Sequence, residues 1–269
     1  MKKEFGIMQG RLLPKFHNKY QAHPIAEWEE EFELAAKLGI KNIEFIFDLY
    51  LYFHNPLVKD LEKIISIQKN SGVLVKSICA DFFMEAPIHR ANKKELEIFH
   101  DLISRLISNL SLLGGTDIVI PFVDNSKIEN DLDKKKIIHF LNSFKNLCEA
   151  KKVNLCLETD LNPSEFKEFI KAFKNSFITI NYDSGNSASL GYSIKEELNN
   201  YGDLITNIHI KDRKLNGESV ILGTGNADLP YLKNFIEQKD FDGIITFQAY
   251  RDNEGIEIFK KQFQYFLNL

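Results

Sequence analysis

Four polar side chains lie at the ends of four apolar segments in the second half of the chain. They are Glu158 in NLCLE, Asp183 in FITINYD, His209 in LITNIHIK and Gln248 in GIITFQAY. Two carboxylates, one imidazole and one amide oxygen form a mixed nitrogen and oxygen ligand set. Such a set suits Mn²⁺, Zn²⁺, Co²⁺ or Mg²⁺ better than a thiolate site would. If the four side chains meet, the sequence predicts a site for one divalent metal ion.

Each of these residues also has a structural interpretation. A carboxylate at a strand end can cap the following helix, and Asp183, which precedes Ser-Gly-Asn, can form a turn. Both interpretations of Asp183 stay open at the level of sequence. Ionisable groups that converge without a partner are costly to bury, so four polar strand ends together, three of them ionisable, favour a metal ion or a substrate.

Further polar residues lie at or just after other predicted strand ends. Lys211 and Arg213 closely follow His209, which favours contact with a phosphate or hydroxyl group of a substrate. Glu44 is open between substrate contact and a salt bridge on the rim. The remaining candidates at these positions are Gln9, Arg11, Asp81 and Asp212.

Eight apolar segments alternate with helical patterns and must position these side chains. The expected strands are 5–9, 42–47, 73–80, 116–122, 154–158, 177–183, 204–211 and 243–250. Eight repeats of strand then helix over 269 residues predict a single-domain (β/α)₈ TIM barrel spanning 1–269. The competing fold, an open doubly wound sheet, is disfavoured because no GxGxxG turn follows the first strand. In a barrel, all eight strand ends meet at one mouth, where active sites form.

Composition limits the partners. Thirty-four Lys and Arg against 38 Asp and Glu give a net charge of -4, spread along the chain, so we expect no nucleic-acid partner. The 3 cysteines, with no CxxC pair, favour a reducing cytosol and a cytoplasmic protein. We expect no signal peptide and no membrane span. A homo-oligomer stays open.

Five segments carry a resemblance to a known family. They are GIMQGRL at 6–12, LETD at 157–160, NYDSGNSASLG at 181–191, HIKDR at 209–213 and LGTGNADLP at 222–230. Together they resemble the xylose isomerase-like family of sugar phosphate isomerases and epimerases. The resemblance implies a (β/α)₈ barrel, carbohydrate metabolism and a metal bound by Glu, Asp, His and Glu after strands five to eight. The first three ligands fall on Glu158, Asp183 and His209, whereas the fourth falls on Gln248.

That departure changes the expected chemistry. In the 3-epimerases of the family, the first and last glutamates move the proton on the two faces of the substrate, and an amide cannot titrate. Three alternatives stay open. Gln248 ligates through its carbonyl oxygen while Glu158 acts on a single face; or another group carries the second proton; or catalysis is lost and the barrel binds a sugar. The candidate second groups are Asp81, Asp212, Glu44 and Lys211.

The expected function is a divalent-metal-dependent isomerase or epimerase of a small sugar, keto-sugar or sugar phosphate. Glu158 would be a metal ligand and the base, and Lys211 the second catalytic group. Substrate-binding residues would be Glu44, Asp81, Asn186, Asp212 and Arg213. The alternatives are a metal-dependent dehydratase of an inosose-like polyhydroxy ketone and a non-catalytic sugar-binding barrel.

Overall fold

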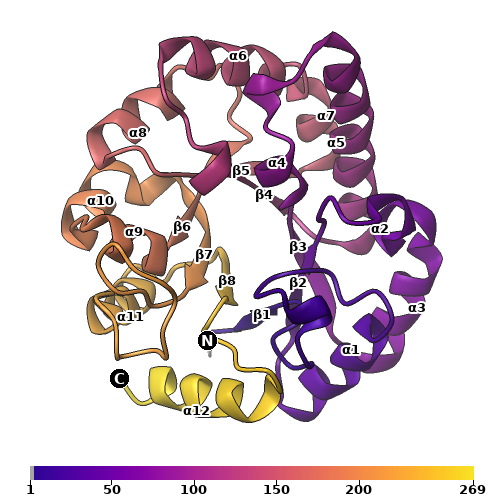
Figure 1. Ribbon diagram of the computed structural model, residues 1–269, viewed down its shortest axis with the longest axis vertical. Helices are drawn as coiled ribbons and strands as arrows, with labels where there is room; N and C mark the ends of the chain where they lie inside the picture. Colours follow the sequence, from indigo (N-terminus) through magenta and orange to yellow (C-terminus); the bar gives the residue numbers. More distant parts are fainter. Residues whose placement is uncertain (1–2) are drawn as a thin grey trace.

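The computed structural model describes residues 3–269, and its eight strands form a closed barrel in chain order (Figure 1). Every neighbouring pair is parallel, and the barrel closes where Ile7 of the first strand pairs with Phe247 of the last. Figure 1 shows the helices as a ring around the strands. The predicted (β/α)₈ barrel is confirmed.

The eight strands fall within the predicted segments or within one residue of them. They are β1 (Gly6–Met8), β2 (Asn42–Ile46), β3 (Leu74–Cys79), β4 (Asp117–Phe122), β5 (Asn154–Thr159), β6 (Ile178–Asp183), β7 (Ile205–Ile210) and β8 (Ile244–Phe247). The last strand stops earlier than expected, so Gln248 is the first residue after β8 rather than a strand residue.

The helices between the strands have the following bounds. They are α1 (Trp28–Lys37), α2 (Pro56–Lys59), α3 (Leu61–Ser71), α4 (Phe82–Glu85), α5 (Lys93–Leu113), α6 (Asp131–Asn142), α7 (Lys145–Lys151), α8 (Pro163–Lys171), α9 (Ser184–Leu190), α10 (Ile194–Tyr201), α11 (Leu229–Gln238) and α12 (Ile256–Leu267). Short 3₁₀ turns lie at Phe16–Asn18, Tyr52–His54, Ile88–Arg90, Asp124–Ser126 and Gly202–Leu204. The sequence analysis did not predict α9.

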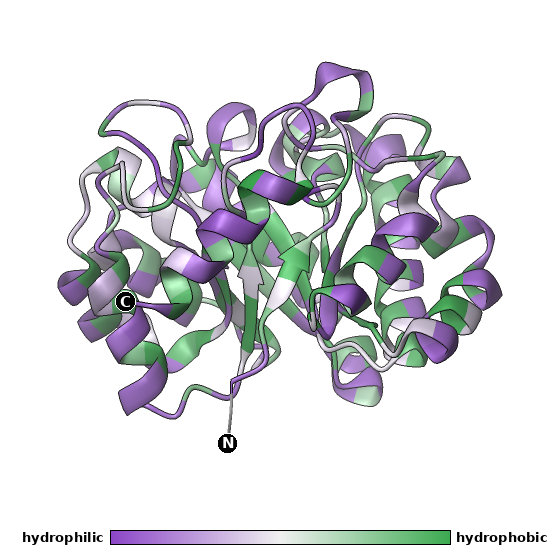
Figure 2. Cartoon of the chain, turned by 90° about the horizontal axis from the view of Figure 1, so that it is seen from below, coloured by the Kyte–Doolittle hydropathy of each residue, from purple (hydrophilic) through white to green (hydrophobic). Residues whose placement is uncertain are grey.

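Two separate apolar regions hold the barrel together. The larger lies between the strands and the surrounding helices and includes Phe32, Leu106 and Phe247. A small cluster fills the inside of the barrel and consists of Met8, Ile46, Cys79, Val119 and Cys156. Figure 2 shows hydrophobic strands at the centre and helices with both hydrophobic and hydrophilic residues. Met8, Ile46 and Cys79 are the last residues of β1, β2 and β3, whereas Val119 and Cys156 lie further from the ends of β4 and β5.

Buried Glu31 on α1 fixes the loop that follows β1. Its carboxylate accepts hydrogen bonds from the main-chain N–H of Gly10 at 2.6 Å and of Leu12 at 2.9 Å. Gly10 has a φ of 82°, and a Cβ there would lie 3.2 Å from Nη1 of Arg251. Burial raises the pKa of Glu31 to about 6. The carboxylate therefore holds the GIMQGRL segment against α1.

We expect Glu31→Ala to lower the free energy of unfolding by about 2–4 kcal/mol, because two buried N–H groups would lose their acceptor. Urea denaturation followed by circular dichroism measures this loss. The matched control is Glu30→Ala on the same helix, where the side chain is exposed and the change should stay within about 0.5 kcal/mol. Equal stability losses in the two variants would contradict the role of Glu31.

Candidate metal centre

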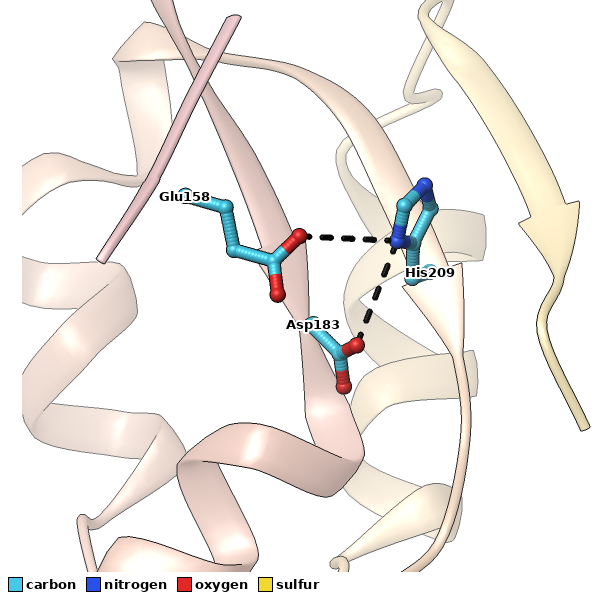
Figure 3. Close-up of side chains that lie close together, drawn as sticks. All are labelled: Glu158, Asp183 and His209. Atoms are coloured by element: carbon cyan, nitrogen blue, oxygen red, sulfur yellow. Dashed lines mark ion pairs between the residues drawn. The ribbon is translucent and has the colours of Figure 1, made fainter. Parts of the chain in front are cut away.

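Glu158, Asp183 and His209 come together at the ends of β5, β6 and β7. One potential ligand atom from each lies within 4.8 Å of the other two, and all three residues are buried. Nδ1 of His209 is 3.7 Å from Oε2 of Glu158 and 3.9 Å from Oδ2 of Asp183. Figure 3 shows both carboxylates facing the same ring nitrogen. The donor set can surround one small cation.

The imidazole ring of His209 is fixed from its other nitrogen. Nε2 lies 2.7 Å from Oε1 of Glu44, and both side chains are fully buried. Oε2 of Glu44 accepts hydrogen bonds from Ser77 at 2.6 Å and from Asn207 at 3.0 Å. Such a carboxylate orients an imidazole ligand and raises its basicity. With Nε2 against Glu44, Nδ1 of His209 faces Glu158 and Asp183.

Asp183 uses its two carboxylate oxygens differently. Oδ1 accepts the main-chain N–H groups of Gly185 and Asn186, both at 2.8 Å, and so caps α9. Oδ2 faces His209 and lies 3.4 Å from Nζ of Lys211. The two interpretations of Asp183 that the sequence left open therefore apply together, one to each oxygen.

Glu158 is held by two asparagine side chains. Nδ2 of Asn181 donates to Oε2 at 2.8 Å, and Nδ2 of Asn186 donates to Oε1. Nδ2 of Asn181 also lies 3.1 Å from Nδ1 of His209. Burial, followed by the charge of Asp183, raises the pKa of Glu158 to about 7. The carboxyl group therefore exchanges its proton near neutral pH.

Gln248, the fourth predicted ligand, lines the same cavity as Glu158. Its Nε2 donates a hydrogen bond to Oε1 of Gln21 at 2.9 Å. Its own Oε1 is buried and has no hydrogen-bond partner among residues 3–269. A buried carbonyl oxygen without a donor is costly, so this atom needs a partner that the protein itself does not provide.

The charges at the centre fit a divalent cation. Although burial would lower the pKa of His209, the neighbouring carboxylates, Glu44 foremost, raise it to about 9. Glu158 and His209 thus keep protons that a cation would displace, because metal ligands must be deprotonated. Together with the unpartnered Oε1 of Gln248, these groups fit the single divalent ion expected from the sequence.

A cavity of about 640 Å³ opens above the centre, and most predicted site residues line it. The lining includes Asp81, Glu158, Asn186, Lys211, Arg213 and Gln248. Oδ1 of Asn186 accepts hydrogen bonds from Lys211 at 3.3 Å and from Arg213 at 2.8 Å. Asn186 thus joins the two cations to Glu158. The two predicted substrate-binding residues that do not line the cavity are Glu44 and Asp212.

Both exceptions have a physical reason. Glu44 lies in the middle of β2, one layer below the strand ends, and its carboxylate is occupied by His209, Ser77 and Asn207. Asp212 is fully buried beneath the loop between β7 and α11. Its carboxylate accepts the main-chain N–H groups of Gly223 at 2.9 Å, Gly225 at 2.8 Å and Ala227 at 3.0 Å.

The sequence analysis missed three residues that shape the site. Asn181 lies two residues before Asp183 on β6, so strand alternation places both on the same face, and this signal was available. Gln21 lies in an irregular segment before α1, where no periodic pattern points to the site. Arg251 lines the cavity and donates to the carbonyl of Leu13 at 2.5 Å.

Residues 32–269 match the family model described as Xylose isomerase-like TIM barrel. The chain belongs to this family. The resemblance predicted from the sequence motifs is therefore confirmed. Comparison of this xylose isomerase-like barrel with curated proteins gave no sequence match.

Solved structures share the fold of this xylose isomerase-like barrel at low sequence identity. The alignment with the apo form of 3-keto-D-glucoside 4-epimerase YcjR from E. coli covers 100% of both chains, with a TM-score of 0.76 and 16% sequence identity. The IOLI protein with a bound zinc atom gives 0.76 at 16%, over 99% of this chain and 98% of that one. D-psicose 3-epimerase, crystallised in the presence of D-fructose, gives 0.73 at 14%, over 99% and 97%.

At 14–16% sequence identity, this likeness shows a shared fold and nothing finer. No helix within residues 3–269 has the length and apolar character needed to cross a bilayer.

We expect the affinity for Mn²⁺ to rise with pH, because Glu158 and His209 hold protons with pKa values of about 7 and about 9. Each displaced proton should contribute about tenfold in affinity per pH unit below the relevant pKa. Titration calorimetry from about pH 6 to about pH 8.5, in buffers of different ionisation enthalpy, measures both affinity and proton release. A flat affinity profile without proton release would contradict the assignment.

We expect Asp212→Asn to lower the free energy of unfolding by about 1.5–3 kcal/mol and to leave Mn²⁺ affinity unchanged. An amide NH₂ would face main-chain N–H groups that now bind a carboxylate. Urea denaturation and calorimetry measure the two quantities. The control is Asp203→Asn, whose exposed side chain lies 3.6 Å from Lys239. A selective loss of metal or substrate binding with full stability would restore Asp212 to the binding site.

Proposed function

We propose that the protein is a divalent-metal-dependent isomerase or epimerase of a small sugar, keto-sugar or sugar phosphate. The observation that carries the proposal is the buried set of Glu158, Asp183 and His209 beneath a polar cavity. A cavity of about 640 Å³ is within the usual range for small-molecule sites. Membership of the xylose isomerase-like family and the fold shared with sugar epimerases support the substrate class.

Glu158 is the proposed base as well as a ligand. Glu158 lines the cavity, so its ionised carboxylate can abstract a proton from a bound substrate. When bound, a divalent ion stabilises negative charge that develops on substrate oxygens. Asn181 and Asn186 hold the carboxylate in place, so the proton is taken from a fixed direction.

Substrate oxygens would be held by the charged and amide groups on the β6 and β7 side of the cavity. Nζ of Lys211 is 3.4 Å from Asp183 and 3.3 Å from Asn186, so it is fixed beside the centre. Although burial would lower the pKa of Lys211, the charges of Asp183 and Glu158 raise it, which keeps the amine cationic. We propose that Lys211, with Arg213 and Asn186, binds hydroxyl or phosphate oxygens.

The second proton transfer depends on which groups reach the substrate. Gln248 cannot titrate, and neither Glu44 nor Asp212 lines the cavity. Asp81 and Lys211 do line it. A proton moved between adjacent carbons on one face needs Glu158 alone, whereas epimerisation through opposite faces needs a second group, for which we propose Asp81 or Lys211.

The test is ¹H NMR in D₂O with Mn²⁺-loaded protein and a panel of ketoses, ketose phosphates and inososes. We expect an isomeric product with deuterium at the carbon that lost its proton. Glu158→Gln should lower kcat at least about 10²-fold, because it removes the base. The matched control is Glu165→Gln on α8, an exposed carboxylate outside the cavity lining, which should leave kcat unchanged.

Two other outcomes would overturn the proposal in favour of defined alternatives. An unsaturated product would identify a dehydratase, since the same base can eliminate water β to the carbonyl. Sugar-dependent shifts in melting temperature without deuterium exchange in any substrate would identify a sugar-binding barrel.

A further inference from the structure

The amide of Gln248, which lines the same cavity as Glu158, has two possible orientations that exchange the places of its oxygen and its NH₂ group. In the structure Nε2 donates to Oε1 of Gln21 at 2.9 Å, while Oε1 is buried and without a partner among residues 3–269. Whether the oxygen or the NH₂ group of Gln248 faces Gln21 depends on whether Gln21 presents a hydrogen-bond acceptor or a donor. An acceptor at Gln21 requires the NH₂ group of Gln248, and a donor would require its oxygen.

Two charged side chains fix the amide of Gln21. Nη2 of Arg11 lies 2.9 Å from Oε1 of Gln21, and a guanidinium can only donate. On the other side, Nε2 of Gln21 donates to Oδ2 of Asp81 at 2.7 Å. Arg11 is itself buried and held by the carbonyl of Ala249 at 3.0 Å, directly after Gln248. Reversing the Gln21 amide would place its NH₂ against the guanidinium and its oxygen against the carboxylate.

We infer that Gln21 is a positioning residue: held between Arg11 and Asp81, it binds the NH₂ group of Gln248 and so directs Oε1 of Gln248 to the divalent metal ion. This inference rests on the metal centre of the proposed function. It explains how an amide serves at this position, since the neutral ligand is oriented by a chain of hydrogen bonds that begins at Arg11 and Asp81.

The same chain disfavours a carboxylate at position 248. A glutamate there would place an acceptor oxygen about 2.9 Å from the acceptor Oε1 of Gln21. Gln21 cannot relieve this contact by turning over, because Arg11 and Asp81 hold both ends of its amide. The effect of Gln21 on metal binding should therefore change sign with the residue at position 248.

The experiment is a set of Mn²⁺ titrations by calorimetry on the full chain. Gln21→Met, which removes the amide at similar size, should weaken Mn²⁺ binding by roughly tenfold or more. In the Gln248→Ala background the same change should have no further effect, since no amide remains to be oriented. In the Gln248→Glu background Gln21→Met should instead tighten binding, because it removes the opposing acceptor.

An equal loss in all three backgrounds would overturn the inference and indicate that Gln21 only maintains the cavity. Absence of any loss in the wild-type background would also overturn it. Melting curves of the metal-free variants check folding, and Gln21→Leu provides a second substitution of similar size if Gln21→Met is unstable. The double variant Glu158→Ala with His209→Ala tests the metal centre separately from the role of Gln21. Unchanged Mn²⁺ affinity in the double variant would contradict the metal centre itself. Lost affinity in the double variant, together with unchanged affinity in Gln21→Met, would contradict only the positioning role.

Discussion

Three carboxylates buried around one imidazole ring are the constraint on which the rest of the site depends. Glu44, Glu158 and Asp183 all face His209 and are buried at or below the mouth of the barrel. Buried charge of one sign is costly unless it is hydrogen-bonded and balanced. The asparagines of β6, β7 and α9 supply hydrogen bonds, Lys211 supplies one cation, and a divalent ion would supply the rest.

The neutral amide of Gln248 leaves the position after β8 without the negative charge that a glutamate would carry. A carboxylate lies instead at Asp81, after β3, and reaches Gln248 through Gln21 at hydrogen-bond distances of 2.7 and 2.9 Å. Arg11 holds the same amide from the other side. The cavity therefore has a titratable group on the β5 side and another on the β3 side, while the position after β8 contributes an oxygen without a charge.

The strand pattern predicted the fold and the centre well, for reasons that particular residues make clear. Glu158, Asp183 and His209 lie at strand ends, and a parallel barrel brings such ends together whatever the loops do. Glu44 lies two residues before the end of β2 and thus one layer deeper, so it contacts His209 and does not line the cavity. The partners of Asp212 lie 11–15 residues further along an irregular loop, and Gln21 lies 227 residues from Gln248, so no local spacing reveals either set of contacts.

The position of a bound ion is the most direct measurement. A crystal soaked in Mn²⁺, with anomalous diffraction to locate the metal, should show one ion bound by carboxylate oxygens of Glu158 and Asp183, Nδ1 of His209 and Oε1 of Gln248. Ligand distances should be about 2.0–2.3 Å, with the Nε2 of Gln248 still on Gln21. No ion at this centre, or an ion bound without the oxygen of Gln248, would contradict the four-residue metal site.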